Sequence, residues 1–144
     1  MKSIRQILGS KEGSVLSISP ETLVYEALRY MAEKNVGALL VLKGGKLVGI
    51  FSERDYARKV ILKGKSSLKT PVGDIMTERV RFVRPDQTVE ECMALMTEKH
   101  VRHLPVLEGD EVVGIVSIGD LVKATIEEKD FVIKQLENYI TGGR

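Results

Sequence analysis

Apolar and polar residues follow an order along this chain that predicts five elements in succession. A short apolar segment at 15–18 is expected to be extended, and a helix is expected to follow it, with Ser19 as N-cap and Pro20 as first residue. The apolar positions of that helix recur at helical spacing: Val24, Ala27, Leu28 and Met31. Two apolar runs, 38–42 and 47–51, flank a glycine turn and predict a β-hairpin. A second helix is expected from about Glu53.

The same order returns 65 residues later. Residues 80–126 align with residues 15–61 without a gap, and 18 of the 47 aligned pairs are identical. Each copy therefore predicts a β-α-β-β-α unit, so the fold class is α/β (α+β). Because a unit of about 50 residues buries a small fraction of its surface when alone, the two copies are expected to share one core.

Three segments lie outside the repeat. Residues 1–14 contain a short helical candidate with Ile4, Ile7 and Leu8, and only the second half of the linker 62–79 is expected to be ordered. The stretch 127–141 predicts a C-terminal helix whose apolar stripe must pack on its own module or on a second chain. The expected division is 1–68 for the first repeat with its N-terminal segment, 69–127 for the second repeat, and 128–144 for the C-terminal helix and tail.

Composition restricts the partners. The chain has 144 residues, 43% hydrophobic and 29% charged, and a formal net charge of +2. Both signs of charge are scattered, so no broad surface for nucleic acid or membrane is expected. The single Cys92 cannot form an internal disulfide, no apolar run reaches the length of a membrane span, and the N-terminus lacks a signal-peptide stretch. A cytoplasmic protein is expected.

Two polar residues recur where a strand meets a helix. Ser52 and Asp55 in the first copy correspond to Ser117 and Asp120 in the second. One interpretation is a capping box, in which Ser accepts a bond from a first-turn amide and Asp accepts one from the N-cap amide. The other is a nucleotide site, in which helix amides attract phosphate and Asp accepts bonds from the two hydroxyls of a ribose. The residues alone leave both open.

With these junctions, the linker phrase Val72-Gly73-Asp74-Ile75-Met76-Thr77 and the phrase Arg102-His103-Leu104-Pro105-Val106, the chain resembles a tandem pair of cystathionine β-synthase (CBS) domains. The resemblance covers both repeats, and the small stand-alone members of the family are the most similar. It implies two CBS repeats packed around a pseudo-twofold axis with two clefts between them, plus the C-terminal helix. In relatives these clefts take AMP, ADP or ATP, and sometimes NAD or S-adenosylmethionine, and two modules commonly form a homodimer.

The resemblance also implies a role for individual residues. Asp55 and Asp120 correspond to the ribose-binding acids of the two clefts, with Ser52 and Ser117 as hydroxyl partners. The adenine slots fall on apolar or small residues of facing repeats: Val36 and Gly37 facing Ile115, and Val101 facing Ile50. The candidate phosphate ligands are basic residues near the second strand and the junction: Arg102, His103 and Arg54. Thr77 and Gly119 complete the set of candidate binding residues.

The two clefts are not expected to be equivalent. Arg102 and His103 align with Gly37 and Ala38, and Arg54 aligns with Gly119. The two copies therefore differ in their candidate phosphate ligands, and one cleft can be empty.

Other reactive residues favour structural roles. Cys92 lies on an apolar helix stripe and is expected to be a buried small hydrophobe. His100 aligns with Asn35 at a helix end, and no further His or Cys completes a metal set, so no metal site is expected. His103 is left open between a phosphate contact and a structural histidine.

No Ser-His-Asp or Cys-His set occurs at repeated positions, so the chain is not expected to be an enzyme. The favoured function is a regulatory module that binds an adenine nucleotide (AMP, ADP, ATP or NAD) and transmits its occupancy to a dimer or to an unidentified regulated protein. One alternative is a constitutive dimer or adaptor with vestigial clefts that uses its C-terminal helix. A weaker alternative binds single-stranded nucleic acid through Arg81, Arg84 and Arg102, but it lacks the stacking aromatics that such sites need.

Overall fold

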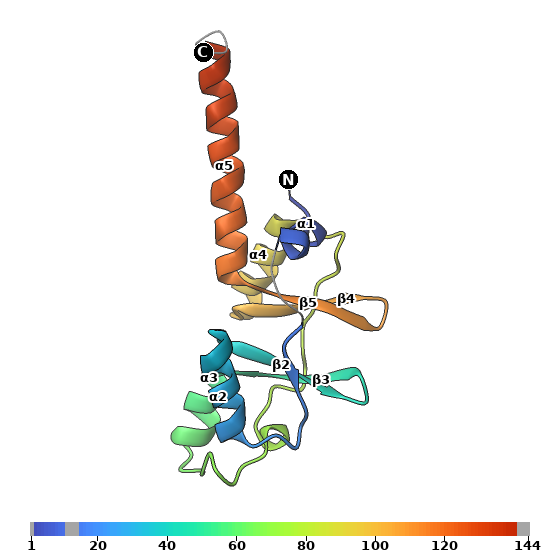
Figure 1. Ribbon diagram of the computed structural model, residues 1–144, viewed down its shortest axis with the longest axis vertical. Coiled ribbons are helices and arrows are strands. Elements are labelled where there is room, and N and C mark those ends of the chain that lie inside the picture. The colour runs from blue at the N-terminus through green and yellow to red at the C-terminus, as the bar shows by residue number, and fades with distance from the viewer. Residues whose placement is uncertain (1, 11–14, 141–144) are drawn as a thin grey trace.

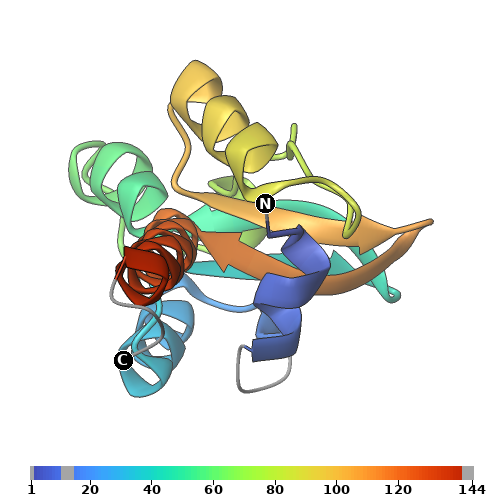
Figure 2. The same ribbon diagram turned by 90° about the horizontal axis from the view of Figure 1, so that it is seen from above.

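Two β-hairpins, one from each repeat, lie face to face in the middle of the molecule, and helices cover their outer faces (Figure 1). Seen from above, the β4–β5 hairpin lies over the β2–β3 hairpin (Figure 2). This computed structural model describes residues 2–10 and 15–140. The mixed α+β fold of two repeats that the sequence predicts is confirmed.

The first repeat holds a three-stranded sheet in the order β1-β2-β3, and the second holds a two-stranded sheet, β4-β5. The elements in chain order are α1 (Ile4–Ser10), β1 (Ser17–Ile18), α2 (Val24–Lys34), β2 (Ala38–Lys43), β3 (Lys46–Ser52), α3 (Glu53–Tyr56), the π-helical turn η1 (Ala57–Ile61), the 3-10 turn η2 (Val72–Asp74), α4 (Val89–Lys99), β4 (His103–Glu108), β5 (Glu111–Ser117) and α5 (Ile118–Ile140).

The internal repeat extends to strand register. Ile18 pairs in parallel with Val41, and 65 residues later Val83 pairs in parallel with Val106. The second copy has only this single bridge where the first has β1, so its predicted first strand is shortened to one residue. Both hairpins also shift register at equivalent places, between Val41 and Leu42 and between Val106 and Leu107. The turn of the first hairpin needs positive φ at both central residues, which Gly44 (58°) and Gly45 (80°) supply.

The predicted helix start at Ser19 and Pro20 is wrong. Helix α2 begins at Val24 and α4 at Val89. The carbonyls of Pro20 and Thr22 instead accept hydrogen bonds from the amides of Gly73 and Val72, both 2.8 Å. The backbone before the helix is therefore used to hold the linker, which a helical turn at 20–22 could not do.

The first half of the linker is ordered, contrary to the prediction. The amide of Val24 donates to the Thr70 carbonyl (2.9 Å), and the amide of Tyr25 donates to the Ser67 carbonyl (3.0 Å). These are the unpaired amides at the start of α2, so the linker closes the end of the helix. A polar composition did not reveal this role, because the bonds are made by backbone groups.

The apolar residues form two cores rather than the single shared core that was expected. One core gathers Val24, Met31, Leu39 and Phe51 with other residues of the first repeat. The other gathers their counterparts in the second repeat together with Ile4 and Ile7 of α1: Val89, Met96, Leu104 and Val116. Each sheet covers its own core with its outer face, and the inner faces carry the buried Leu40 and Pro105, which alternate with the core residues along β2 and β4.

The two terminal helices belong with the second repeat. Helix α1, which precedes the first repeat in sequence, packs into the second repeat's core. Helix α5 runs from Ile118 to Ile140 as one helix, continuing through the segment 127–140 that was predicted to be a separate C-terminal helix. The domain division made from the sequence stays a prediction.

Candidate functional site

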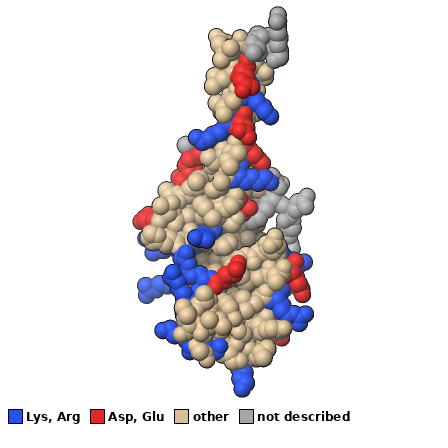
Figure 3. Space-filling model, turned by 90° about the vertical axis from the view of Figure 1, so that its left-hand side faces the viewer, with Lys and Arg blue, Asp and Glu red and all other residues tan. Residues whose placement is uncertain are grey.

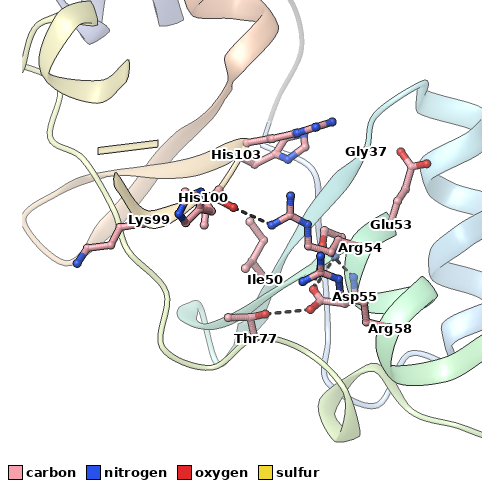
Figure 4. Close-up of a pocket in the computed structure, with 13 residues that line it drawn as sticks. Gly37, Ile50, Glu53, Arg54, Asp55, Arg58, Thr77, Lys99, His100 and His103 are labelled. Carbon is pink, nitrogen blue, oxygen red and sulfur yellow. Dashed lines mark hydrogen bonds between the residues drawn. The ribbon is translucent and has the colours of Figure 1, made fainter. Parts of the chain in front are cut away.

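A cavity of about 530 Å³ lies between the two repeats, at the junction where β3 ends and α3 begins (Figure 4). From the first repeat it is lined by this junction and by Gly37, and from the second by the segment that connects α4 to β4. Thirteen residues line it: Gly37, Ile50, Ser52, Glu53, Arg54, Asp55, Arg58, Thr77, Lys99, His100, Val101, Arg102 and His103. Its size falls within the range of about 300–1,000 Å³ usual for small-molecule sites.

Asp55 is held in place by the start of its own helix. Ser52 is the N-cap of α3, and its hydroxyl accepts a bond from the Asp55 amide (3.2 Å), while Asp55 Oδ2 accepts one from the Ser52 amide (2.9 Å). The capping interpretation of this motif is therefore confirmed. It does not exclude the second interpretation, because the same carboxylate lines the cavity.

The other oxygen of Asp55 is also occupied. Oδ1 accepts a hydrogen bond from the Thr77 hydroxyl (3.0 Å) and forms an ion pair with Lys59 Nζ (3.1 Å). The carboxylate is nearly buried, with 8% of the side chain exposed, whereas 42% of the Lys59 side chain is exposed. A ligand hydroxyl that reaches Oδ1 must therefore replace Lys59 or Thr77, and the exposed Lys59 is the partner that can leave at least cost.

Thr77 reaches Asp55 because the linker pairs with the edge of β3. Ile50 and Thr77 exchange both backbone bonds, from the Ile50 amide to the Thr77 carbonyl (3.0 Å) and from the Thr77 amide to the Ile50 carbonyl (2.9 Å). The linker thus brings the Thr77 hydroxyl to the cavity, although Thr77 lies 22 positions from Asp55 in the chain. The residue 65 positions before Thr77 is Glu12, which lies outside the described residues.

The cavity is rich in positive charge. Four cationic side chains line it, against two carboxylates, Glu53 and Asp55: Arg54, Arg58, Lys99 and Arg102. Lys and Arg side chains gather beside the groove between the two halves of the molecule (Figure 3). Within the described part of the chain, Arg58 and Arg102 form no ion pair. An anion in the cavity would meet cations that no carboxylate neutralises.

Arg54 links the two repeats across the cavity. Its Nη1 donates a 2.7 Å hydrogen bond to the carbonyl of His100, the residue that ends α4 in the left-handed conformation (φ 55°) (Figure 4). His100 and its counterpart Asn35 (φ 54°) both take this conformation, as their alignment at a helix end predicts.

Gly37 lies where a larger residue would narrow the cavity. A Cβ there would come within 2.9 Å of Glu53 Oε1 and 3.4 Å of His103 Cε1. The Gly37 carbonyl accepts a 3.1 Å bond from the Glu53 amide, so β2 and the start of α3 are joined at this point. In the second repeat the corresponding bond runs from the Ile118 amide to the Arg102 carbonyl (2.9 Å).

The cavity brings together nine of the fourteen residues that the sequence marked as binding candidates: Gly37, Ile50, Ser52, Arg54, Asp55, Thr77, Val101, Arg102 and His103. Gly37, which was expected opposite Ile115, lines the cavity of Asp55. The other five candidates lie outside this cavity: Val36, Ile115, Ser117, Gly119 and Asp120.

Four lining residues were not among the candidates: Glu53, Arg58, Lys99 and His100. Arg58 had a signal in the sequence, since it follows Arg54 by one helical turn and shares its face. Lys99 and His100 directly precede the candidate Val101. They line the cavity only because of the way in which the second repeat packs against the first, which their sequence does not indicate.

Asp120 makes the same cap in the second repeat. The Ser117 amide donates to Asp120 Oδ2 (2.8 Å), and the Asp120 amide donates to the Ser117 hydroxyl (3.1 Å). The position of Lys59, however, is taken by Ala124, which is buried. The two junctions therefore share a backbone arrangement and differ in the charged groups around it.

Other features bear on the remaining candidate chemistries. Cys92 is fully buried, as predicted, and burial raises the pKa of its thiol to about 11. Across residues 2–10 and 15–140, no group of three or more His, Cys, Asp or Glu side chains is placed to hold a metal ion. No helix in those ranges is both long and apolar enough to cross a bilayer. Arg84 lies over the Phe82 ring at 5.2 Å, so this aromatic face is already stacked.

Comparison with known proteins finds the same two repeats in the chain. A family model described as CBS domain matches residues 5–62 and 72–127. The CBS domain-containing protein CBSX3, mitochondrial, of Arabidopsis thaliana is 45% identical over 139 residues, which cover 93% of this chain and 68% of that protein. A solved structure of a protein with CBS domains from Burkholderia ambifaria is 50% identical, with a TM-score of 0.85 over 88% of this chain and 95% of that one.

Another similar structure contains ligands. It is the CBS domain pair of protein MJ0100 in complex with 5′-methylthioadenosine and S-adenosyl-L-methionine, with a TM-score of 0.78 over 89% of this chain and 98% of that one. At 24% identity, this likeness shows a shared fold and nothing further.

Proposed function

The chain belongs to the family of CBS domain proteins, and from this premise we propose that it is a regulatory module that binds an adenine nucleotide in the cavity at Asp55. The family model that matches this chain describes a CBS domain, and CBS domain pairs are regulatory units. That the chain is not an enzyme stays a prediction.

The observation that carries the proposal is the position of Asp55. A nearly buried carboxylate lies in a cavity that both repeats line, beside three arginines from both repeats, Arg54, Arg58 and Arg102. A ribose offers two adjacent hydroxyl donors to a carboxylate, and a phosphate offers acceptors to guanidinium groups. A nucleotide carries both groups a few ångströms apart.

Binding of the ribose requires an exchange of partners at Asp55. The four hydrogen-bonding positions of its carboxylate are filled by the amide and hydroxyl of Ser52, by Thr77 and by Lys59. The ribose hydroxyls can take the place of the half-exposed Lys59, while the Ser52 amide keeps the carboxylate oriented. The ammonium of Lys59 is then free to approach the phosphates.

The apolar part of the cavity suits a base. Ile50 and Val101 lie on the two sides contributed by the first and second repeats. The flat faces of adenine can pack between such side chains while the backbone supplies hydrogen bonds to its edge. In the MJ0100 complex the same fold holds adenosyl compounds, which supports the choice of adenine over another base.

Regulation would follow from the position of the cavity between the repeats. A ligand there contacts both, and it shifts their relative orientation only by its difference in affinity for the two arrangements. A bound phosphate would compete with the His100 carbonyl for the Arg54 guanidinium group. We therefore expect the hydrogen bond from Arg54 to His100 to be the contact between the repeats that a ligand weakens first. We expect the response to pass to a second copy of the chain or to a regulated protein.

Titration calorimetry with AMP, ATP and NAD, together with the thermal midpoint at each ligand concentration, tests the proposal. A ligand that binds only the folded protein raises the midpoint as its concentration increases. We expect saturable heat and a raised midpoint with at least one of the three. Neither heat nor a shift at millimolar concentration of any of them would show that the cavity does not bind adenine nucleotides.

An adaptor function is a second candidate, and the observation that favours it is an exposed apolar stripe on α5. An adaptor would associate through α5 whether or not nucleotide is present. Its expected behaviour is therefore unchanged association when Asp55 is replaced, and loss of association when residues 127–144 are deleted.

A further inference from the structure

Helix α5 projects far beyond the body of the molecule (Figure 1). Every residue from 129 to 140 is exposed. A helical segment of about a dozen residues is marginally stable in water without tertiary contacts, and this one carries large apolar side chains into solvent. The projecting part of α5 therefore requires a covering surface that its own chain does not supply within the described residues.

The exposed apolar residues of α5 follow a seven-residue repeat. Ile126, Ile133 and Ile140 are spaced by seven, and a second set precedes each of them by four residues: Val122, Lys129 and Leu136. The apolar members are between 42% and 80% exposed. Alternating spacings of three and four place all six on one side of the helix, which is the pattern of a coiled-coil seam. Phe131 is exposed on the opposite side and does not belong to it.

The two sides of this seam differ in chemistry. Thr125, Val132 and Tyr139 border it on one side, each directly before an isoleucine of the repeat. Lys123, Asp130 and Glu137 border it on the other. In a parallel pair of identical helices the first border faces the second, which would set Val132 and Tyr139 against charged side chains. In an antiparallel pair each border faces its own copy, so Val132 meets Val132 and charged side chains meet charged side chains.

We propose that α5 pairs with α5 of a second copy of the chain, antiparallel, along the seam Val122, Ile126, Lys129, Ile133, Leu136 and Ile140. Centred on position 131, this pairing places Ile126 against Leu136 of the second copy, and Val122 against Ile140. The overlap of residues 122–140 is about 27 Å long at 1.5 Å per residue.

Charge complementarity supports the antiparallel direction. Lys123 of one copy then lies beside Glu137 of the other, twice per dimer. Lys129 lies against Ile133, with its ammonium directed to the border where the two Asp130 side chains meet. In the parallel direction Lys129 would face Lys129 of the second copy inside the seam, which is unfavourable.

A membrane surface is a poorer occupant. Helices that lie on membranes carry mainly Lys and Arg on their polar face, whereas the polar residues of α5 beyond Ile126 include Glu127, Glu128, Asp130 and Glu137. The inference names a surface for the self-association in the proposed function, but it does not depend on nucleotide binding.

Sedimentation velocity of the full chain without ligand is the first test. We expect a dimer for the native chain at tens of micromolar, and a dissociation constant raised about 100-fold or more by Ile133→Lys, which sets a second positive charge against Lys129 of the other copy inside the seam. Gln135→Lys adds the same charge on the opposite face and should leave the dimer intact. Ile133 is exposed, so both variants should keep the native circular dichroism and thermal midpoint of the body. A monomeric native chain, or a dimer insensitive to Ile133→Lys, overturns the proposal.

Crosslinking by mild oxidation tests the direction. In the antiparallel dimer, Ile126→Cys and Leu136→Cys chains should form a disulfide-linked dimer when coexpressed, and neither should do so alone. Native Cys92 does not interfere because it is fully buried. Linkage of each variant with itself, but not between the two, would show parallel helices and overturn the antiparallel arrangement. Calorimetry with nucleotide is read separately, so failure of one proposal leaves the other interpretable.

Discussion

The two strand-to-helix junctions of this chain have the same backbone and different surroundings. At both, a serine caps the helix and an aspartate three residues later completes the box. Around Asp55 lie Thr77, Lys59 and Arg54, whereas the positions of Lys59 and Arg54 hold Ala124 and Gly119 around Asp120. Both repeats therefore use the same capping motif to begin their helix. The two junctions differ in the candidate ligand-binding groups that surround the aspartate.

The largest expected difference is in nucleotide affinity. Asp55→Asn removes the charge that accepts the ribose hydroxyls but leaves an oxygen for the Ser52 amide. Since hydrogen bonds to charged groups contribute about 1.5–3 kcal/mol, affinity should fall about 10- to 100-fold. Asp120→Asn is the matched control and should leave the dissociation constant unchanged. Calorimetry with whichever nucleotide binds the native chain measures both, and an equal loss in the two variants would contradict the distinction.

The second difference lies in the cores, where buried Cys92 corresponds to buried Ala27. Burial raises the pKa of Cys92 from 9.0 to about 11. The Cys92 thiol therefore loses its proton in the unfolded chain first as pH rises. Its contribution to the stability of the folded state is complete below pH 9 and declines up to pH 11, by about 3 kcal/mol in total.

Cys92→Ala should remove that part of the alkaline decline. Urea unfolding of the native chain and the variant at pH 8 and at pH 10.5 gives the comparison. Since other groups titrate in both proteins, the difference between their slopes is the quantity to read. Identical slopes would mean that the thiol is not held protonated by the core.

Two aligned glycines should differ in their tolerance of a side chain. A Cβ on Gly49 would lie 2.5 Å from Met76 Sδ and 3.1 Å from the backbone carbonyl oxygen of Thr77. The three atoms nearest to a Cβ on Gly114 all belong to the Leu8 side chain, the first of them at 2.6 Å. Side chains yield more easily than backbone, so Gly49→Ala should cost about 1–3 kcal/mol and Gly114→Ala less.

Gly49→Ala should also displace Thr77 from Asp55 and weaken nucleotide binding, which Gly114→Ala should not do. Denaturant unfolding and calorimetry of the two variants separate these effects. Loss of stability in Gly49→Ala with native affinity would show that Thr77 does not help to shape the site.

The smallest effect is expected where the repeats are alike. Ser52→Ala and Ser117→Ala each remove one N-cap and should lower the free energy of unfolding by about 1 kcal/mol. Near-equal losses in urea unfolding would support a common structural role, while a loss at only one position would show that the caps are not equivalent.

Much of this architecture is visible in the sequence because it is local. The glycine turn of the first hairpin, the left-handed ends at Asn35 and His100, and the caps at Ser52 and Ser117 each depend on residues within a few positions of one another. The repeat makes such assignments stronger, since each pattern occurs twice. The fold class followed from these elements.

The errors came from contacts between distant segments. Helix α2 starts four residues later than Pro20 suggests because backbone groups at 20–22 bond the linker, and the hydrophobic repeat could not report that pairing. Helix α1 precedes the first repeat in the chain, so its position in the sequence did not indicate that it packs in the core of the second repeat. Lys99 and His100 were missed as cavity residues because the way the two repeats face each other, rather than any motif, brings them to the cavity.

A crystal structure of the chain grown with AMP or ATP is the most direct test of the nucleotide site. We expect the ribose hydroxyls within hydrogen-bonding distance of the Asp55 carboxylate, with Lys59 displaced and the phosphates near Arg54, Arg58 or Arg102. A nucleotide bound at Asp120 instead, with Asp55 still bonded to Thr77 and Lys59, would contradict it.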